Sequence, residues 1–113
     1  MTRTATVLSL IILFAPVVAA AAAESYVKIT APVDGAKLDG MALTKLVYEA
    51  VPGPAGDHVH VYVGGKEVGI LRQLKGSYTL ETLPAGHQRI CVKVVNKAHV
   101  PTGVEQCVEV TAE

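Results

Sequence analysis

Residues 58–71 read HVHVYVGGKEVGIL, and this stretch decides the fold because polar and apolar side chains alternate up to a glycine pair. Alternation with a period of two is typical of a β-strand with one buried face. Gly64 and Gly65 suit a two-residue hairpin turn, since both of its central positions need a positive φ. The stretch therefore predicts a β-hairpin. Its first arm carries Val59, Val61 and Val63 on one face and His58, His60 and Tyr62 on the other.

The turn also predicts how the two arms of the hairpin pair. If the residues that flank the glycine pair face each other, Val61 lies opposite Val68, and apolar side chains meet on one face. On the other face His60 lies opposite Gly69. A glycine at that position leaves the space beside His60 unfilled.

Further short segments with the same alternation lie on both sides of the hairpin, and Gly and Pro separate them. No segment has a helical period. For residues 42–51 the alternation does not decide which face is buried, because Leu43 and Val47 compete with Leu46 and Tyr48. These segments predict an all-β protein, a β-sandwich of seven or eight antiparallel strands. The strands expected outside the hairpin cover residues 26–31, 36–38, 42–51, 78–83, 88–95 and 104–111.

The two cysteines predict a disulfide between the last two strands. If Cys91 and Cys107 lie opposite each other, the same register pairs Arg89 with Glu109 and Lys93 with Glu105. Two opposite-charge pairs on the face that carries the cysteines favour this register. Thiolate ligands to a metal are the alternative, and an oxidising compartment favours the disulfide.

The N-terminal residues 1–23 predict a cleaved signal peptide. Arg3 precedes an apolar run that ends in five alanines, and cleavage is expected after Ala23. An uncleaved anchor is the alternative, but the run is near the lower length for spanning a membrane and its end is alanine. We therefore expect a periplasmic or secreted protein that does not insert into a membrane after cleavage. Residues 24–113 are expected to form one domain.

Charge and composition exclude several classes of function for residues 24–113. Of the 10 basic residues only Arg3 is removed with residues 1–23, so nine remain against 10 acidic residues, a net charge of −1. Such a balance offers no basic surface for nucleic acid. Ser25 and Ser77 are the serines of this part, and neither lies in a nucleophile-like turn. We therefore do not expect an enzyme.

Three stretches resemble immunoglobulin-like domains of exported bacterial proteins: APVDGA at 31–36, HVYVGGKEVG at 60–69 and GSYTLETLPAGH at 76–87. The resemblance covers essentially all of residues 24–113 and implies an immunoglobulin-like sandwich. The chain differs from antibody domains because it has no Trp and because its cysteines lie on neighbouring late strands. The H-x-H strand and the NKAHVP loop at 96–101 are similar to a group of small bacterial exported domains, and this likeness implies no particular activity.

The sharpest chemical feature is the run Asp57-His58-Val59-His60. Residues two apart on a strand share a face and lie about 6.6 Å apart along it, so two imidazoles can converge on one ion. In the immunoglobulin-like topology His99 lies at the same end of the sandwich, whereas His87 lies at the opposite end. Three imidazoles suit copper or zinc, and Asp57 can orient an imidazole from the second shell.

Other interpretations of these residues stay open. The two histidines of the strand can be polar alternation on an exposed face, and His99 can hydrogen-bond within its own loop. Asp57 can be a turn residue. We expect an exported, non-enzymatic protein that binds copper or zinc through His58, His60 and His99. The alternative is an interaction module of the cell envelope that recognises a protein or a glycan.

Overall fold

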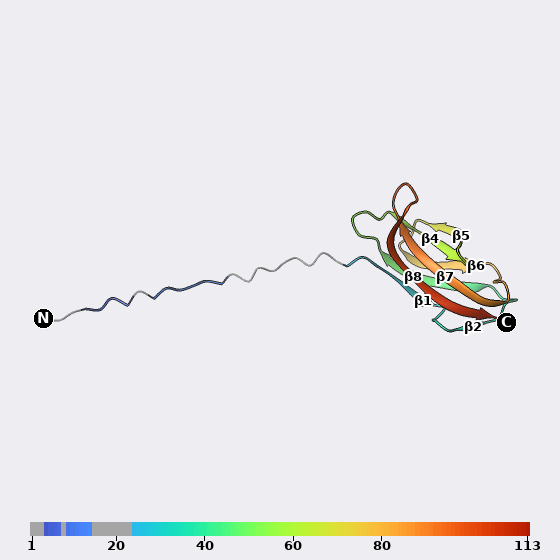
Figure 1. The fold of residues 1–113 in the computed structure, drawn as a ribbon, viewed down its shortest axis with the longest axis horizontal. Helices are drawn as coiled ribbons and strands as arrows, with labels where there is room; N and C mark the ends of the chain where they lie inside the picture. The colour runs from blue at the N-terminus through green and yellow to red at the C-terminus, as the bar shows by residue number, and fades with distance from the viewer. Residues whose placement is uncertain (1–3, 8, 15–23) are drawn as a thin grey trace.

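The computed structural model describes residues 4–7, 9–14 and 24–113 (Figure 1). The expected cleavage point after Ala23 lies outside the described residues. Residues 4–7 and 9–14 have no regular secondary structure. Within the described ranges, no helix has the length and hydrophobicity needed to cross a membrane.

The described residues from 24 onward form eight strands in two facing sheets and no helix, which confirms the expected all-β sandwich. One sheet has the order β1-β3-β6, and the other has the order β2-β8-β7-β4-β5 (Figure 1). The strands are β1 (Tyr26–Ala31), β2 (Lys37–Leu38), β3 (Thr44–Val51), β4 (His58–Val63), β5 (Lys66–Leu71), β6 (Lys75–Leu80), β7 (Gly86–Val95) and β8 (Pro101–Ala112).

β3 begins at Thr44 and β7 at Gly86, each two residues from the expected start, and three further differences bear on the fold. The short strand β2 pairs with β8 in parallel, so the sandwich is not wholly antiparallel. β6 begins at Lys75 and ends at Leu80, because its ladder with β3 runs from Lys75 to Leu80; Leu83 is buried without belonging to the strand. β8 begins at Pro101, so the loop between β7 and β8 is only residues 96–100.

The core lies between the two sheets and is built mainly from alternate residues of the strands. The sequence left open which face of β3 is buried. The buried residues are Leu46 and Tyr48, which are 0% and 2% exposed, whereas Leu43 is 67% exposed. Val59 and Val61 of β4 are fully buried in the same core, as their alternation predicted. The opposite face of β4 therefore carries the histidines away from the core.

The hairpin of β4 and β5 has the expected turn but not the expected register. Gly64 and Gly65 have φ values of 59° and 81°, as the turn requires. Beyond the turn a β-bulge shifts the pairing by one residue, so that His60 lies opposite Ile70 and Val61 lies opposite Gly69. The expected pairing of Val61 with Val68 is therefore wrong, and the space beside His60 is not left open by a glycine.

The physical reason for this shift lies across the core, in Tyr78 of β6. A Cβ atom at position 69 would lie only 2.9 Å from Cζ of Tyr78, so the inner face of β5 needs a glycine there. The Tyr78 hydroxyl donates a hydrogen bond of 3.0 Å to the carbonyl of Val68, the extra residue of the bulge. Gly69 and Tyr78 together hold the bulge in place.

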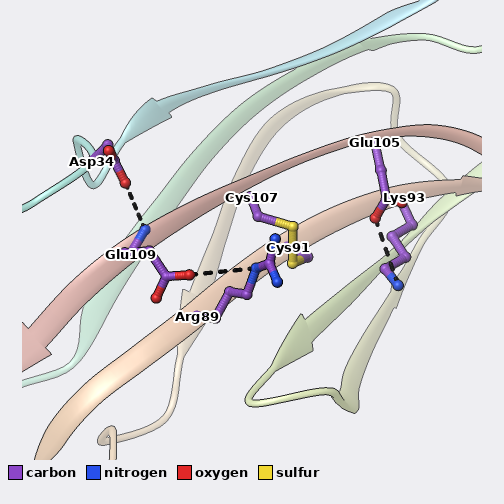
Figure 2. Close-up of a disulfide and its surroundings, with 7 residues drawn as sticks. All are labelled: Asp34, Arg89, Cys91, Lys93, Glu105, Cys107 and Glu109. Atoms are coloured by element: carbon purple, nitrogen blue, oxygen red, sulfur yellow. Dashed lines mark hydrogen bonds and ion pairs between the residues drawn. A yellow bond between two sulfur atoms is a disulfide. The ribbon is translucent and has the colours of Figure 1, made fainter.

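The disulfide between Cys91 and Cys107 is present, and its predicted register is confirmed (Figure 2). Arg89 lies opposite Glu109 and Lys93 opposite Glu105, with nitrogen–oxygen distances of 3.5 and 3.6 Å. The described residues contain no free cysteine, so thiolate ligands are excluded there. The disulfide links β7 to β8, the two strands joined by the loop that carries His99.

Candidate metal centre

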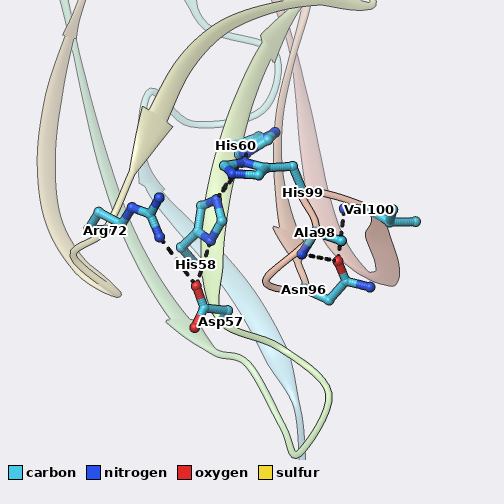
Figure 3. A network of polar contacts seen from close by, with 8 residues as sticks. All are labelled: Asp57, His58, His60, Arg72, Asn96, Ala98, His99 and Val100. Carbon is cyan, nitrogen blue, oxygen red and sulfur yellow. Dashed lines mark hydrogen bonds and ion pairs between the residues drawn. The ribbon is translucent and has the colours of Figure 1, made fainter.

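The structure brings His58, His60 and His99 together at one end of the sandwich (Figure 3). Nε2 of His58 lies 3.1 Å from Nε2 of His60 and 3.1 Å from Nδ1 of His99. Nε2 of His60 lies 3.0 Å from Nδ1 of His99. Three ring nitrogens, one from each residue, therefore form a nearly equilateral triangle.

The two histidines of β4 are buried, which differs from the exposed face that the sequence suggested. His58 is 0% and His60 is 2% exposed, whereas His99 is exposed. The His99 ring covers both of them, with ring centroids 4.6 Å from that of His58 and 5.2 Å from that of His60. Ile70, which the bulge places opposite His60, is the neighbour on the β5 side. Polar alternation on an exposed strand face does not explain these two histidines, because a buried imidazole loses its hydration.

His99 reaches the cluster from the tight loop between β7 and β8. Oδ1 of Asn96 accepts hydrogen bonds from the backbone amides of Ala98 and Val100, at 2.9 and 3.1 Å. The amide of His99 donates to the carbonyl of Asn96 at 2.9 Å. Asn96 therefore organises the loop, and the His99 ring contacts the other two histidines (Figure 3).

The backbone of His99 has a positive φ of 63°, the left-handed region that residues with a Cβ adopt at a cost of about 1–2 kcal/mol. Among the described residues other than glycine, it is the one with such a φ. The loop thus holds this residue in a costly conformation that directs its ring at β4. Strain of this kind tends to persist at functional sites.

Asp57 fixes the tautomer of His58. Its Oδ2 atom lies 2.9 Å from Nδ1 of His58 and 3.4 Å from Nη1 of Arg72. The hydrogen bond from His58 is the main cause that lowers the pKa of Asp57, which favours the ionised carboxyl as the acceptor of a hydrogen bond from Nδ1–H of His58. Nε2 of His58 then presents its lone pair to the triangle. The backbone amide of Asp57 also donates to the carbonyl of Val95, so the residue ends the preceding loop as well.

Glu67 is a neighbour of the site that the sequence did not reveal. Its Oε2 atom lies 3.4 Å from Nδ1 of His60 without forming a hydrogen bond. Among the buried side-chain nitrogens and oxygens described, His60 Nδ1 is the one that lacks a hydrogen-bond partner. If Nε2 of His60 is a ligand, Nδ1 carries the proton of the neutral ring, and Glu67 is the acceptor at hand.

The surroundings of His60 favour its neutral form. Burial is the largest cause that lowers the pKa of His60, and the nearby carboxylate of Glu67 opposes it only in part. The neighbouring histidines and Arg72 lower the pKa further. A neutral imidazole is the form that binds a metal.

His87 lies at the opposite end of β7, as expected. It pairs with Thr111, and its Nδ1 atom lies 3.4 Å from the hydroxyl of that residue. His58, in contrast, pairs with Val95 at the other end of the same strand. His87 therefore has the same side-chain chemistry without access to the cluster.

The triangle has the size that a metal ion requires. A point in its plane at equal distance from all three nitrogens lies about 1.8 Å from each, from edges of 3.0–3.1 Å. Because zinc–nitrogen bonds measure about 2.0–2.1 Å, a point about 1 Å above this plane lies at that distance from all three nitrogens. Without an ion, the three nitrogens cannot all be satisfied by hydrogen bonds to one another, since one N–H points well at only one partner.

Comparison with solved structures agrees on the fold. The chain superposes on a fibronectin(III)-like module of CbhA from Clostridium thermocellum with a TM-score of 0.65 and 20% identity, covering 77% of this chain and 96% of the module. An engineered protein gives a TM-score of 0.56 at 22% identity, covering 80% of this chain and 20% of that protein. No family model and no curated protein matches the sequence. The chain therefore has a fibronectin(III)-like fold, an immunoglobulin-like sandwich architecture, and its function has to be argued from its site.

Proposed function

We propose that the protein is an exported, non-enzymatic binding protein that holds one copper or zinc ion at His58, His60 and His99. The observation that carries the proposal is the triangle of ring nitrogens with edges of 3.0–3.1 Å. Three protein ligands leave at least one coordination position for water or for a donor from another molecule. Such a site suits the sequestration of a metal ion or its delivery to a partner.

The surroundings of the triangle support the same proposal. Asp57 and Glu67 stand behind His58 and His60 at the ring nitrogens that face away from the triangle. Ligating histidines usually direct their second nitrogen at a carboxylate, a backbone carbonyl or water, which fixes the ring and strengthens it as a ligand. In this proposal Asp57 orients the His58 ring through its contact with Nδ1. The disulfide supports export, because such bonds persist in oxidising compartments.

Titration calorimetry on the exported protein tests the proposal at neutral pH, where an imidazole with an ordinary pKa near 6.5 is mostly neutral. The wild type should bind one equivalent of Cu(II) or Zn(II). Replacing any ligand, as in His60→Ala, should weaken binding by more than about 100-fold, beyond the usual effect of a second-shell change. His87→Ala is the matched control and should bind like the wild type.

Two results would contradict the proposal. If the wild type binds no stoichiometric metal, the site has no metal function. If His87→Ala weakens binding as much as His60→Ala, the ligands have been assigned wrongly.

A second candidate function, recognition of an envelope protein, rests on a groove that Glu67 borders but no histidine lines. The groove has a volume of about 380 Å³ and is open to solvent between β5 and the segment that follows β6. Val68, Tyr78 and Leu83 give it an apolar lining, and Lys66 and Glu81 add opposite charges. With a single aromatic ring in the lining, the groove suits a peptide better than a glycan. Proteins captured by the wild type but not by a Val68→Asp variant would support this second function.

A further inference from the structure

We propose that Asn96 is a positioning residue of the metal centre. It holds the loop of residues 96–100 in the shape that presents Nδ1 of His99, rather than Nε2, to His58 and His60. This inference rests on the proposed metal-binding function. It adds a residue outside the ligand set on which the affinity of the site depends, and it assigns the nitrogen through which the third histidine binds the ion.

The third ligand nitrogen differs from the other two. His58 and His60 reach the triangle with Nε2, the ring nitrogen farther from the backbone, whereas His99 reaches it with Nδ1. Nδ1 is bonded to the ring carbon that joins the side chain, so the backbone of His99 has to lie close to the cluster. A loop that moves away from β4 therefore withdraws this nitrogen from the ion.

Packing contributes little to holding the loop close to β4. Residues 97–100 are exposed, and Val100 is 53% exposed although it is apolar. The backbone of His99 has the left-handed φ of 63°, a conformation that persists in such a residue only where its surroundings enforce it. Hydrogen bonds therefore have to maintain the shape of the loop.

Asn96 supplies these hydrogen bonds from the first position of the loop. Its Oδ1 atom accepts from the backbone amides of Ala98 and Val100, the residues on either side of His99 (Figure 3). Its own amide donates to the carbonyl of Val100 at 2.9 Å, and its carbonyl accepts from the amide of His99 at 2.9 Å. Only the two side-chain hydrogen bonds depend on which residue stands at position 96. Removing Oδ1 releases the two amides that flank the third ligand.

The base of the loop is fixed to the strand that carries the other two ligands. Val95, directly before Asn96, lies opposite His58 in the ladder between β7 and β4. The carbonyl of Val95 accepts a hydrogen bond of 2.8 Å from the backbone amide of Asp57. Asn96 thus starts from a position that is fixed relative to β4. The shape that it gives the loop decides where Nδ1 of His99 lies relative to His58.

Zinc titration of the exported protein and three variants tests the role of Asn96. Asn96→Ala should weaken Zn(II) binding about 10- to 100-fold, as for other residues that support a ligand. Asn96→Asp keeps an oxygen that can accept from the same amides and should recover about tenfold or more of this loss. The comparison is made in about 1 M salt, where the added charge is largely screened. Val100→Ala is the matched control in the same loop, because it keeps the amide that Asn96 binds, and it should bind zinc like the wild type.

Nuclear magnetic resonance of the zinc-loaded wild type tests the assignment of the ligand nitrogen. The nitrogen chemical shifts of the rings should place the remaining proton of His99 on Nε2 and those of His58 and His60 on Nδ1. This measurement needs no variant, so it does not depend on how any substitution affects folding.

Four results would overturn the inference: zinc bound to Nε2 of His99, an unchanged affinity in Asn96→Ala, no recovery in Asn96→Asp, or an equal loss in Val100→Ala. Failure of the proposed function is a different result, because the wild type itself would then bind no stoichiometric zinc.

Discussion

The substitution Gly69→Ala tests whether the bulge in β5 shapes the metal centre. Position 69 has no unusual backbone requirement, since its φ lies outside the left-handed region. The added Cβ would lie 2.9 Å from Cζ and 3.0 Å from the hydroxyl oxygen of Tyr78, where ordinary contacts are 3.4 Å or more. The tyrosine ring must therefore move by about 0.5 Å or more, well beyond what close-packed neighbours absorb at no cost.

The cost of this movement follows from the contacts that the ring makes. The hydrogen bond from Tyr78 to the carbonyl of Val68 is lost or stretched, which costs about 0.5–1.5 kcal/mol. Overpacking adds about 1–3 kcal/mol in a full core, but Tyr78 is only half-buried, so the low end applies. Replacing glycine by alanine adds about 0.4–1 kcal/mol to the unfolding free energy, because alanine reduces the conformational entropy of the unfolded chain. The net loss of unfolding free energy should be about 1–2 kcal/mol.

Urea denaturation and zinc titration measure the two consequences of Gly69→Ala. Because the bulge places Ile70 opposite His60 and lies directly after Glu67, zinc affinity should also fall, by about tenfold, as for the loss of a contact that supports a ligand. The same substitution in a Tyr78→Ala background is the control. With the ring gone, the new methyl group meets no clash and should be neutral or stabilising. An equal loss of stability in both backgrounds would refute the explanation given for the bulge.

Three further outcomes are expected. The double variant Cys91→Ala/Cys107→Ala should lose about 3 kcal/mol of unfolding free energy in urea, because the bond closes a loop with a sequence separation of 16; a loss below about 1 kcal/mol would argue against the staple. Asp57→Asn and Glu67→Gln should each weaken zinc binding about 10- to 100-fold with little change in the far-ultraviolet circular dichroism spectrum, and unchanged affinities would deny both residues a supporting role. In the metal-free protein the pKa of His60 is lowered, so the unfolded chain binds the proton first and the unfolding free energy should fall as the pH drops through about 6.5. An unfolding free energy that rises as the pH falls over this range would contradict this prediction.

The parts of the fold that the sequence predicted are those set by local rules. The glycine pair at 64–65 fixed the turn, and the alternation of β4 fixed which side chains enter the core. The disulfide register followed from the two charge pairs that flank the cysteines and share one antiparallel register with them. The meeting of His58, His60 and His99 at one end of the sandwich followed once the order of the strands was assumed.

The parts that the sequence did not predict depend on contacts between segments far apart in the chain. The bulge arises because Tyr78, from another sheet, occupies the space in front of position 69. Glu67 pairs with Tyr62, before the bulge, and no sequence motif marks its approach to His60. The burial of the histidines depends on a loop about 40 residues later in the chain, because the His99 ring covers them.

The cost of building the cluster is itself an argument for a ligand. Two imidazoles are removed from water at 0% and 2% exposure, and a third is held by a loop with a strained backbone. The fold does not need these groups, because Val59, Val61 and their neighbours already supply the apolar side of β4. Apolar residues at positions 58 and 60 would fit a covered strand face at lower cost. Metal coordination, as proposed, would offset these costs, since an ion would accept the three converging lone pairs that hydrogen bonds among the rings cannot satisfy together.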